Sequence, residues 1–360
     1  MKSKIRIGLI GCGRISYKHI EAISSLFTEV ELVAVCDIVE ERAIKAAEEY
    51  VGRLQEAGIK AEIFTPMVYT NIEEMFENER LQVVSICTPS GLHPVHGIKA
   101  AKKGIHVITE KPMATNLKFA DELIQACDEY KARLFVVKQN RLNATMQLLK
   151  RTVDKGRFGR IYMILVNVLW TRPQSYYNEA KWRGTWEFDG GAFMNQASHY
   201  VDAAEWIGGP VESVAAITGT LARKIETEDS GVAVLKFRNG IIGSINVTML
   251  TYPKNMEGSI TVIGEKGTVK IGGIALNKFE KWEFAEGDED DIVVQSSNYE
   301  PLNVYGFGHT LYYKNVLDVL KHNAEPNTDG REGRKSLELI LGIYKSSREG
   351  RTIHLPLDLY

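Results

Sequence analysis

Ile5-Arg-Ile-Gly-Leu-Ile10, followed at once by Gly11-Cys-Gly13-Arg-Ile-Ser16, is the stretch that decides the fold. Its first half predicts a short buried strand, and its second half is a glycine-rich turn that leads into a helical pattern. This order is typical of an α/β unit that binds a dinucleotide, because N–H groups at the helix start can face a pyrophosphate. A Cβ on Gly11 or Gly13 would obstruct that approach. Ser16 replaces the third glycine of the usual fingerprint, so a tight turn without a ligand stays an alternative.

The first part of the chain alternates strand and helix patterns. Further strands are predicted at 31–37, 83–88, 106–110 and 133–138, and helices at 39–50, 92–103 and 116–130. Nearly continuous hydrophobicity in these strands indicates a parallel sheet covered on both faces. We therefore predict a Rossmann domain over residues 1–138. Residues 52–70 fit the alternation poorly and are interpreted as an insertion.

The second part of the chain is dominated by strands. After a helix that begins near residue 143, strands are predicted at 161–170, 211–220, 231–238, 241–249, 258–263 and 267–271, and helices at 309–322 and 331–348. Asn239-Gly240 is a typical tight hairpin turn, which indicates antiparallel pairing. The fold class is thus α/β, with a second domain over 139–360 that contains a large, mostly antiparallel sheet.

Composition narrows the classes of partner. The chain has 360 residues, 44% of them apolar, and a formal net charge of −2. It lacks the positive excess that binding to nucleic acid or to an anionic membrane would require. No apolar run approaches the roughly 20 residues needed to cross a bilayer. We expect a cytoplasmic protein whose partners are small molecules.

Cysteines and histidines do not predict a metal site. The cysteines have neither zinc spacing nor a disulfide-dense pattern, so we interpret them as buried free thiols: Cys12, Cys36, Cys87 and Cys127. His93 and His96 are three residues apart, a spacing that suits a metal on a helix, but no cysteine or carboxylate accompanies them. We expect no bound metal.

Asp37 ends the second predicted strand, where a carboxylate can accept hydrogen bonds from an adenosine ribose. Its charge would repel a 2′-phosphate, and no Arg or Lys follows immediately. The sequence therefore favours NAD over NADP. A helix-capping aspartate is the alternative, and it is compatible with the same geometry.

Two segments carry candidate catalytic residues. Glu110-Lys111-Pro112 follows the fifth strand, at the edge of the sheet where ligands of open α/β folds bind. Asn195 and His199 are four residues apart, on one face if that segment is helical. A neutral histidine can remove a hydroxyl proton while hydride leaves the same carbon. Taken singly, a solvated loop lysine and a structural histidine are the alternatives.

Together with Cys87-Thr-Pro-Ser-Gly-Leu-His93, these motifs resemble the glucose-fructose oxidoreductase/inositol dehydrogenase (Gfo/Idh/MocA) family over nearly the whole chain. The resemblance implies an NAD-dependent enzyme with a Rossmann domain and an open-faced sheet that forms an oligomer interface. His199 is then the general base, with Lys111 and Asn195 as the other catalytic residues. The cofactor residues that the resemblance implies are Gly11, Gly13, Arg14, Ile15, Asp37, Thr88, Ser90, His93, Glu110, Lys111, Gln139, Trp182 and Arg183.

Asn195 departs from the family pattern, in which aspartate is common. Asparagine can orient a hydroxyl but cannot raise a histidine's basicity by charge. The role of Lys111 is then expected to be larger.

A closer resemblance appears in Val137-Lys138-Gln139-Asn140-Arg141 and in the segment from Trp182 to His199. These stretches look like those of UDP-N-acetylglucosaminuronic acid 3-dehydrogenases of lipopolysaccharide and other surface-polysaccharide synthesis. The resemblance implies oxidation at C3′ of the nucleotide sugar, with NADH reoxidised by 2-oxoglutarate. Lys138, Arg141 and Arg172, together with Lys111, Asn195 and His199, are the expected substrate-binding residues, although each of the three basic side chains also fits a surface cation.

Other functions stay open at this stage. An inositol or simple hexose dehydrogenase is the main substrate alternative, and an NAD-dependent glycosidase of the same fold would release sugar without net NADH. A non-catalytic NAD sensor would lose the catalytic pair, whereas this chain has both Lys111 and His199. We expect a homo-oligomer, a tetramer ahead of a dimer.

Overall fold

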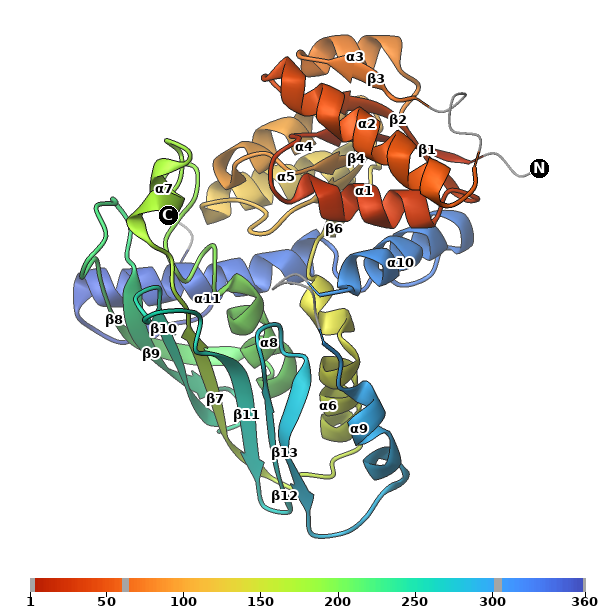
Figure 1. The fold of residues 1–360 in the computed structure, drawn as a ribbon. Coiled ribbons are helices and arrows are strands. Elements are labelled where there is room, and N and C mark those ends of the chain that lie inside the picture. Colours follow the sequence, from red (N-terminus) through yellow and green to blue (C-terminus); the bar gives the residue numbers. More distant parts are fainter. Residues whose placement is uncertain (1–3, 60–64, 301–305, 359–360) are drawn as a thin grey trace. The chain divides into compact units, whose positions relative to one another are not determined.

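The computed structural model describes residues 4–59, 65–300 and 306–358, and the chain divides into two compact units. Unit 1 comprises Met1–Val137 and His309–Gly333, and unit 2 comprises Lys138–Gly308 and Arg334–Tyr360. Figure 1 shows the elements of each unit along the colour bar.

Unit 1 is built on a six-stranded parallel sheet in the order β3-β2-β1-β4-β5-β6. Its strands are β1 (Ile5–Ile10), β2 (Val30–Cys36), β3 (Met67–Tyr69), β4 (Val83–Ile86), β5 (His106–Thr109) and β6 (Leu134–Val136). Its helices are α1 (Ser16–Ser25), α2 (Glu40–Glu56), α3 (Ile72–Asn78), α4 (His93–Lys102), α5 (Leu117–Glu129) and α10 (Gly308–His322). The central strands are almost fully buried, as expected of a doubly wound sheet. The predicted Rossmann fold is confirmed.

The segment interpreted as an insertion belongs in part to this regular fold. Helix α2 continues to Glu56, beyond the predicted end at residue 50, and β3 forms the edge of the sheet beside β2. Residues 60–64 lie outside the described residues. The edge strand escaped prediction because it has only three residues, none of them buried.

Unit 1 also contains a segment that the sequence assigned to the second domain. Residues 309–333 return to the free edge of the first sheet, where Thr328 Oγ1 donates to the Val136 carbonyl at 2.6 Å and Asp329 pairs with Phe135. Within the expected second domain, 139–360, this range thus packs with the first sheet, and the domain boundary itself stays a prediction. Local periodicity predicted helix α10 but carries no information on which sheet the helix packs against.

Unit 2 is built on an eight-stranded sheet in the order β13-β12-β11-β7-β10-β9-β8-β14. Its strands are β7 (Ile161–Leu169), β8 (Val211–Gly219), β9 (Ser230–Phe237), β10 (Ile242–Thr248), β11 (Glu257–Gly264), β12 (Gly267–Gly272), β13 (Lys278–Phe284) and β14 (Ile353–His354). Across the described ranges, the pairs are antiparallel except β7 with β10. The predicted fold class is confirmed, while β13 and β14 are additions.

The helical elements of unit 2 are α6 (Ala144–Asp154), α7 (Gln174–Asn178), α8 (Ser198–Gly208), α9 (Val294–Ser297) and α11 (Gly330–Glu349), with short 3-10 turns at η3 (Gln139–Leu142) and η4 (Glu289–Val293). Helix α8 packs on β7 and β11, and α6 packs on β12. Other side chains of the same sheet remain exposed: Ile217 and Val232, which face each other on β8 and β9, are 80% and 51% exposed.

Two smaller expectations can be settled from the structure. All four cysteines are buried free thiols, as predicted, and burial raises the thiol pKa values, that of Cys36 to about 11. Within the described residues, the longest helices are too short or too polar to span a membrane.

Candidate functional site

The candidate cofactor residues of unit 1 lie along one edge of its sheet. Asp37 follows β2, the glycine turn follows β1, Thr88 and Ser90 follow β4, and Glu110 and Lys111 follow β5. These four strands are consecutive neighbours. Since neighbouring strands are about 4.8 Å apart, the row extends over roughly 14 Å, a shape that suits an extended ligand.

The glycine turn has the geometry that a phosphate group needs. Gly11 has φ +88°, and a Cβ there would lie 2.7 Å from the backbone of Cys87 and Thr88. A Cβ on Gly13 would meet no protein atom within 4 Å, so the space above this residue is open. Helix α1 starts at Ser16, whose hydroxyl donates to the Gly13 carbonyl at 2.7 Å, and its first turn has no acidic residue. The N-terminal end of this helix carries the positive end of the helix dipole, which fits the phosphates of NAD. Arg14 is exposed and Ile15 half-buried beside them.

Asp37 is fixed against the glycine turn. Its two carboxylate oxygens accept from the Cys12 N–H at 2.8 Å and from the Val39 N–H at 2.9 Å. The second bond closes an Asx turn ahead of α2, but the N-cap residue of this helix is Val39, so Asp37 does not cap it. An ionised carboxylate has about four acceptor positions, which leaves capacity for ribose hydroxyls. Ile38, 91% exposed, places an apolar group next to it rather than a cation.

Thr88, Ser90 and His93 form a compact turn after β4. The ring of His93 contacts the Thr88 carbonyl through Nε2 and the Pro112 carbonyl through Nδ1, each at 2.8 Å. Burial lowers the pKa of His93, although the two carbonyls oppose this shift. His93 therefore ties this turn to the loop that carries Lys111. Thr88 Oγ1 contacts Nδ1 of His96 at 3.2 Å.

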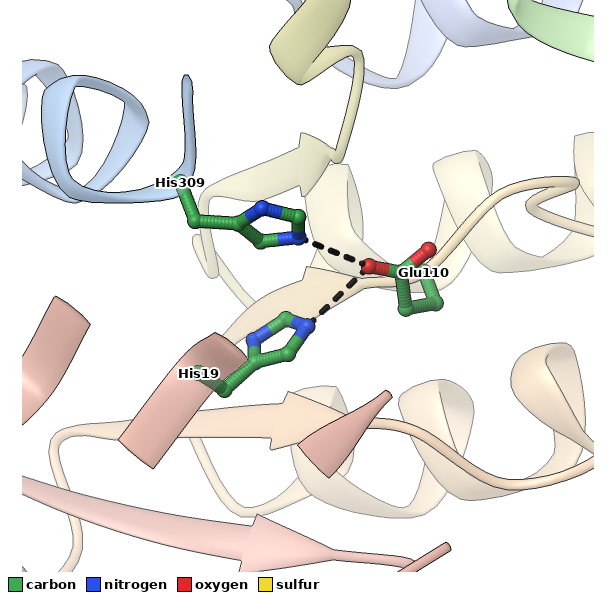
Figure 2. A group of neighbouring side chains, drawn as sticks. All are labelled: His19, Glu110 and His309. Carbon is green, nitrogen blue, oxygen red and sulfur yellow. Dashed lines mark hydrogen bonds and ion pairs between the residues drawn. The ribbon is translucent and has the colours of Figure 1, made fainter. Parts of the chain in front are cut away.

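Glu110 lies at the centre of a buried polar cluster. Its Oε1 is 3.0 Å from Nε2 of His19 on α1 and 3.4 Å from Nε2 of His309 on α10, and Figure 2 shows both rings directed at this oxygen. Its other oxygen accepts from the N–H of Lys111 at 3.1 Å. Burial opposes ionisation, but the two histidines outweigh it and hold the pKa of Glu110 well below its usual range.

Two groups in the described part of the chain have metal-ligand types close together. The first is His19, Glu110 and His309, where hydrogen bonds account for the side chains without an ion. The second is Asp288, Glu289 and Asp290, whose charges are paired with Lys155.

In unit 2, the segment around Asn195 and His199 differs from a continuous helix. Helix α8 begins at Ser198, so Asn195 lies in the turns before it. The Asn195 amide donates to the buried carboxylate of Asp189, which also accepts from the Gly184 N–H at 2.6 Å. The helical neighbour of His199 is instead Asp202, three residues on, and the two groups interact electrostatically.

Lys138 and Arg141 share one buried carboxylate. Arg141 binds Asp202 through Nε at 2.7 Å and a terminal nitrogen at 2.9 Å, and the Lys138 ammonium lies 3.5 Å from Asp202 and 2.6 Å from Ser336 Oγ. Burial raises the pKa of Asp202, yet these two cations dominate and lower it to about 2. Much of their charge is therefore already compensated. Gln139, between them, is buried, and its Oε1 has no hydrogen-bond partner among the described residues.

Arg172 and Arg183 come together on Tyr176. Their guanidinium carbons lie 5.5 Å and 4.2 Å from the centre of this ring. Arg183 is paired with Glu179 at 2.6 Å, whereas Arg172 has no ion pair with a carboxylate in the described part of the chain. Trp182, half-buried, accepts from Thr185 Oγ1 through its carbonyl. Nearby, a cavity of about 430 Å³ has three cations and one carboxylate in its lining: Lys181, Arg183, Lys224 and Glu226.

Models of one oxidoreductase family match both parts of the chain. Residues 5–138 match the family's NAD-binding Rossmann fold, and residues 150–355 match its C-terminal alpha/beta domain. The chain belongs to the Gfo/Idh/MocA oxidoreductase family. It is therefore an NAD-binding oxidoreductase, which confirms the predicted family, enzyme class and cofactor.

Several relatives cover nearly the full chain. The WlbA dehydrogenase of Bordetella pertussis, solved in complex with NADH and UDP-GlcNAcA, is 53% identical over 99% of both chains, with a TM-score of 0.91. The WlbA dehydrogenase of Chromobacterium violaceum, solved with the same two molecules, is 50% identical over 100% of this chain and 98% of its own, with a TM-score of 0.90. A myo-inositol 2-dehydrogenase of Thermotoga maritima is 26% identical over 98% of both chains.

Sequence reasoning missed four polar residues of these sites: His19, His309, Asp189 and Asp202. Asp202 had a signal, since it is three residues from His199, and His19 is a histidine on the buried face of the helix after the glycine turn. Asp189 and His309 had none, because their partners are fixed by tertiary contacts.

Proposed function

We propose that this enzyme oxidises the C3′ hydroxyl of a UDP-linked N-acetylated hexuronic acid, UDP-N-acetylglucosaminuronic acid in the first place, to a 3-keto sugar. The observation that carries the proposal is the 53% and 50% identity, over nearly the whole chain, to two dehydrogenases solved with NADH and UDP-GlcNAcA. A role in making precursors for lipopolysaccharide would follow, since a 3-keto sugar can accept an amino group by transamination.

The proposed step divides the work between two residues. NAD, when bound, accepts the hydride that leaves C3′. His199, as the neutral ring, takes the hydroxyl proton while the C=O bond forms, and Lys111 orients the hydroxyl oxygen. The Asp202 charge favours the protonated form of His199 that results. The family pattern usually has aspartate at position 195, and Asp202 is a carboxylate that can support His199 in its place.

The charge of unit 2 supports an anionic substrate. Among the three cations predicted to bind substrate, Arg172 is the best placed to meet a carboxylate or diphosphate, because Asp202 already compensates Lys138 and Arg141. The cavity described above has three further cations in its lining, Lys181, Arg183 and Lys224, which add to the positive charge of unit 2. Neutral polyols offer no charge to match these groups.

We also propose that 2-oxoglutarate reoxidises the bound NADH and leaves as 2-hydroxyglutarate, and that a second copy of the chain covers the apolar face that includes Ile217 and Val232. A tetramer is favoured over a dimer. The reoxidation step rests on the resemblance to the UDP-sugar dehydrogenases. The contact with a second copy rests on the exposed apolar side chains.

The test is a product assay on the purified protein. Incubation with UDP-N-acetylglucosaminuronic acid and 2-oxoglutarate should give the 3-keto sugar and 2-hydroxyglutarate in equal amounts, with no added NAD if the cofactor copurifies. Native mass spectrometry of the same sample would report bound cofactor and subunit number together. Efficient turnover of inositol or a free hexose, with no reaction of the nucleotide sugar, would contradict the proposed substrate. Product formation only with added NAD, without response to 2-oxoglutarate, would remove the recycling step alone.

A further inference from the structure

A buried hydrogen-bonded chain leads through unit 1 to the backbone of Lys111. From the contacts of His19, Glu110 and His309 we infer that these three residues form a positioning device, which fixes Lys111 for its role in the reaction. The inference rests on the proposed role of Lys111. None of the three residues is assigned contact with the sugar; they act through the residue that follows Glu110.

The hydrogen bonds of the cluster fit one arrangement of protons. The Tyr313 hydroxyl lies 2.9 Å from both Ser85 Oγ and His19 Nδ1, and the Ser85 hydroxyl lies 2.8 Å from the same nitrogen, so Nδ1 accepts from a hydroxyl. With Nδ1 as acceptor, the ring of His19 carries a proton on Nε2 and donates it to Glu110. His309 donates to the same oxygen, and its buried Nδ1 has no partner among the described residues, which suits an unprotonated nitrogen.

In this arrangement an ionised Glu110 accepts from two ring N–H groups, which is consistent with its lowered pKa. The carboxylate then has one oxygen held by both rings and the other directed at the Lys111 N–H, at 3.1 Å. A second contact holds the same loop, since His93 donates to the Pro112 carbonyl at 2.8 Å. A third joins the Glu110 N–H to the Ile86 carbonyl at 3.0 Å. The backbone on both sides of Lys111 is therefore fixed by side chains from α1, α4 and α10.

Packing alone does not explain why polar residues occupy this core position. Apolar side chains of similar volume would fill the space without the cost of removing a carboxylate from water. His19, Glu110 and His309 have one effect that three apolar side chains would lack, because the Glu110 carboxylate accepts a hydrogen bond from the Lys111 N–H. His309 contributes a donor from a segment about 200 positions away, on the helix that closes unit 1.

The experiment compares His309→Leu with a matched core variant on the same helix. Val316, 2% exposed, lies about two turns along α10 from His309 and has no polar side-chain group, so Val316→Ala lowers stability without removing a hydrogen bond of the cluster. Assays are run well below each melting temperature. His309→Leu should lower kcat by roughly 10- to 100-fold, the scale of a misplaced catalytic group. The KM for the UDP-sugar and the affinity for NAD should change by less than about threefold. Val316→Ala should keep normal kcat, and His309→Gln, which retains a donor, should recover most of the loss.

A double variant separates positioning from general damage. In a Lys111→Met background, His309→Leu should cause little further loss, because the group that it positions is gone. Additive losses in the double variant, or a kcat loss no larger than that of Val316→Ala, would overturn this inference and leave the proposed function standing. Normal turnover of Lys111→Met itself would overturn both the role of Lys111 and the positioning device.

Discussion

Replacing Glu228 with glutamine should make the protein more stable in mild alkali and leave it almost unchanged in mild acid. Glu228 is buried in unit 2, where Oε1 accepts from the Phe193 N–H and the Tyr344 hydroxyl, each at 2.9 Å. Its Oε2 has no hydrogen-bond partner among the described residues. A neutral carboxylic acid or its amide analogue satisfies this environment better than a carboxylate does.

The magnitude follows from the pKa. Burial, the largest cause, raises the pKa of Glu228 from 4.5 to about 7, although the bonds from Phe193 and Tyr344 oppose it. The folded state therefore binds the proton more tightly than the unfolded state does, and the associated stability is fully present below pH 4.5 and lost as the pH rises through about 7. One pKa unit corresponds to about 1.4 kcal/mol, so ionisation costs the folded protein about 3 kcal/mol in mild alkali.

Guanidinium unfolding at pH 5 and pH 8, followed by tryptophan fluorescence, measures this difference. All five tryptophans lie within residues 138–308, so the signal reports the unit that contains Glu228. From pH 5 to pH 8 the variant should gain about 2 to 3 kcal/mol over the natural protein. Glu48→Gln, at an exposed position of α2, is the control and should show no comparable gain. Parallel loss of stability by the natural protein and Glu228→Gln over this interval would refute the reasoning.

Two further predictions concern the cofactor and the chemistry. NAD should bind at least about tenfold tighter than NADP. Asp37→Ala should weaken NAD binding and bring the two affinities closer, because the ribose hydrogen bonds and the repulsion of the 2′-phosphate are lost together. Calorimetry that finds equal affinities for the natural protein would contradict this prediction. Lys111→Met and His199→Asn should each lower turnover by about 10²-fold. Calorimetry should find the NAD affinity of His199→Asn unchanged. Near-normal turnover of either variant would remove that residue from the proposed step.

The regular fold was predictable wherever burial imposes a strong local pattern. Strands such as Ile5–Ile10 and Ile161–Leu169 were predicted almost to the residue, because parallel central strands are apolar throughout and sheet strands with one packed face alternate. Strand β13, Lys278–Phe284, was missed because only Phe279 is buried in it, so the strand has no apolar repeat. The helix predicted over 116–130 begins one residue later, at Leu117, because Asn116 is its N-cap and accepts from the Phe119 N–H.

The cofactor edge was predictable for a different reason. Asp37 and Glu110 follow strands directly, and the ends of neighbouring parallel strands meet at one edge whatever the loops do. Lys138 and Arg141 had no such constraint. Their partner Asp202 lies more than 60 positions away, and only the fold shows that one carboxylate holds both cations.

Asn195 shows how a departure from a family pattern can be explained by its neighbours. The sequence alone suggested a loss, because an asparagine brings no charge to His199. In the structure, its amide donates to Asp189, a carboxylate that is 1% exposed and also binds the Gly184 N–H. An aspartate at position 195 would set two carboxylates against each other, and one would have to take up a proton to remain there. Asparagine has the size of aspartate but no charge, so it can lie beside the Asp189 carboxylate without an added proton. The negative charge near His199 comes from Asp202 instead.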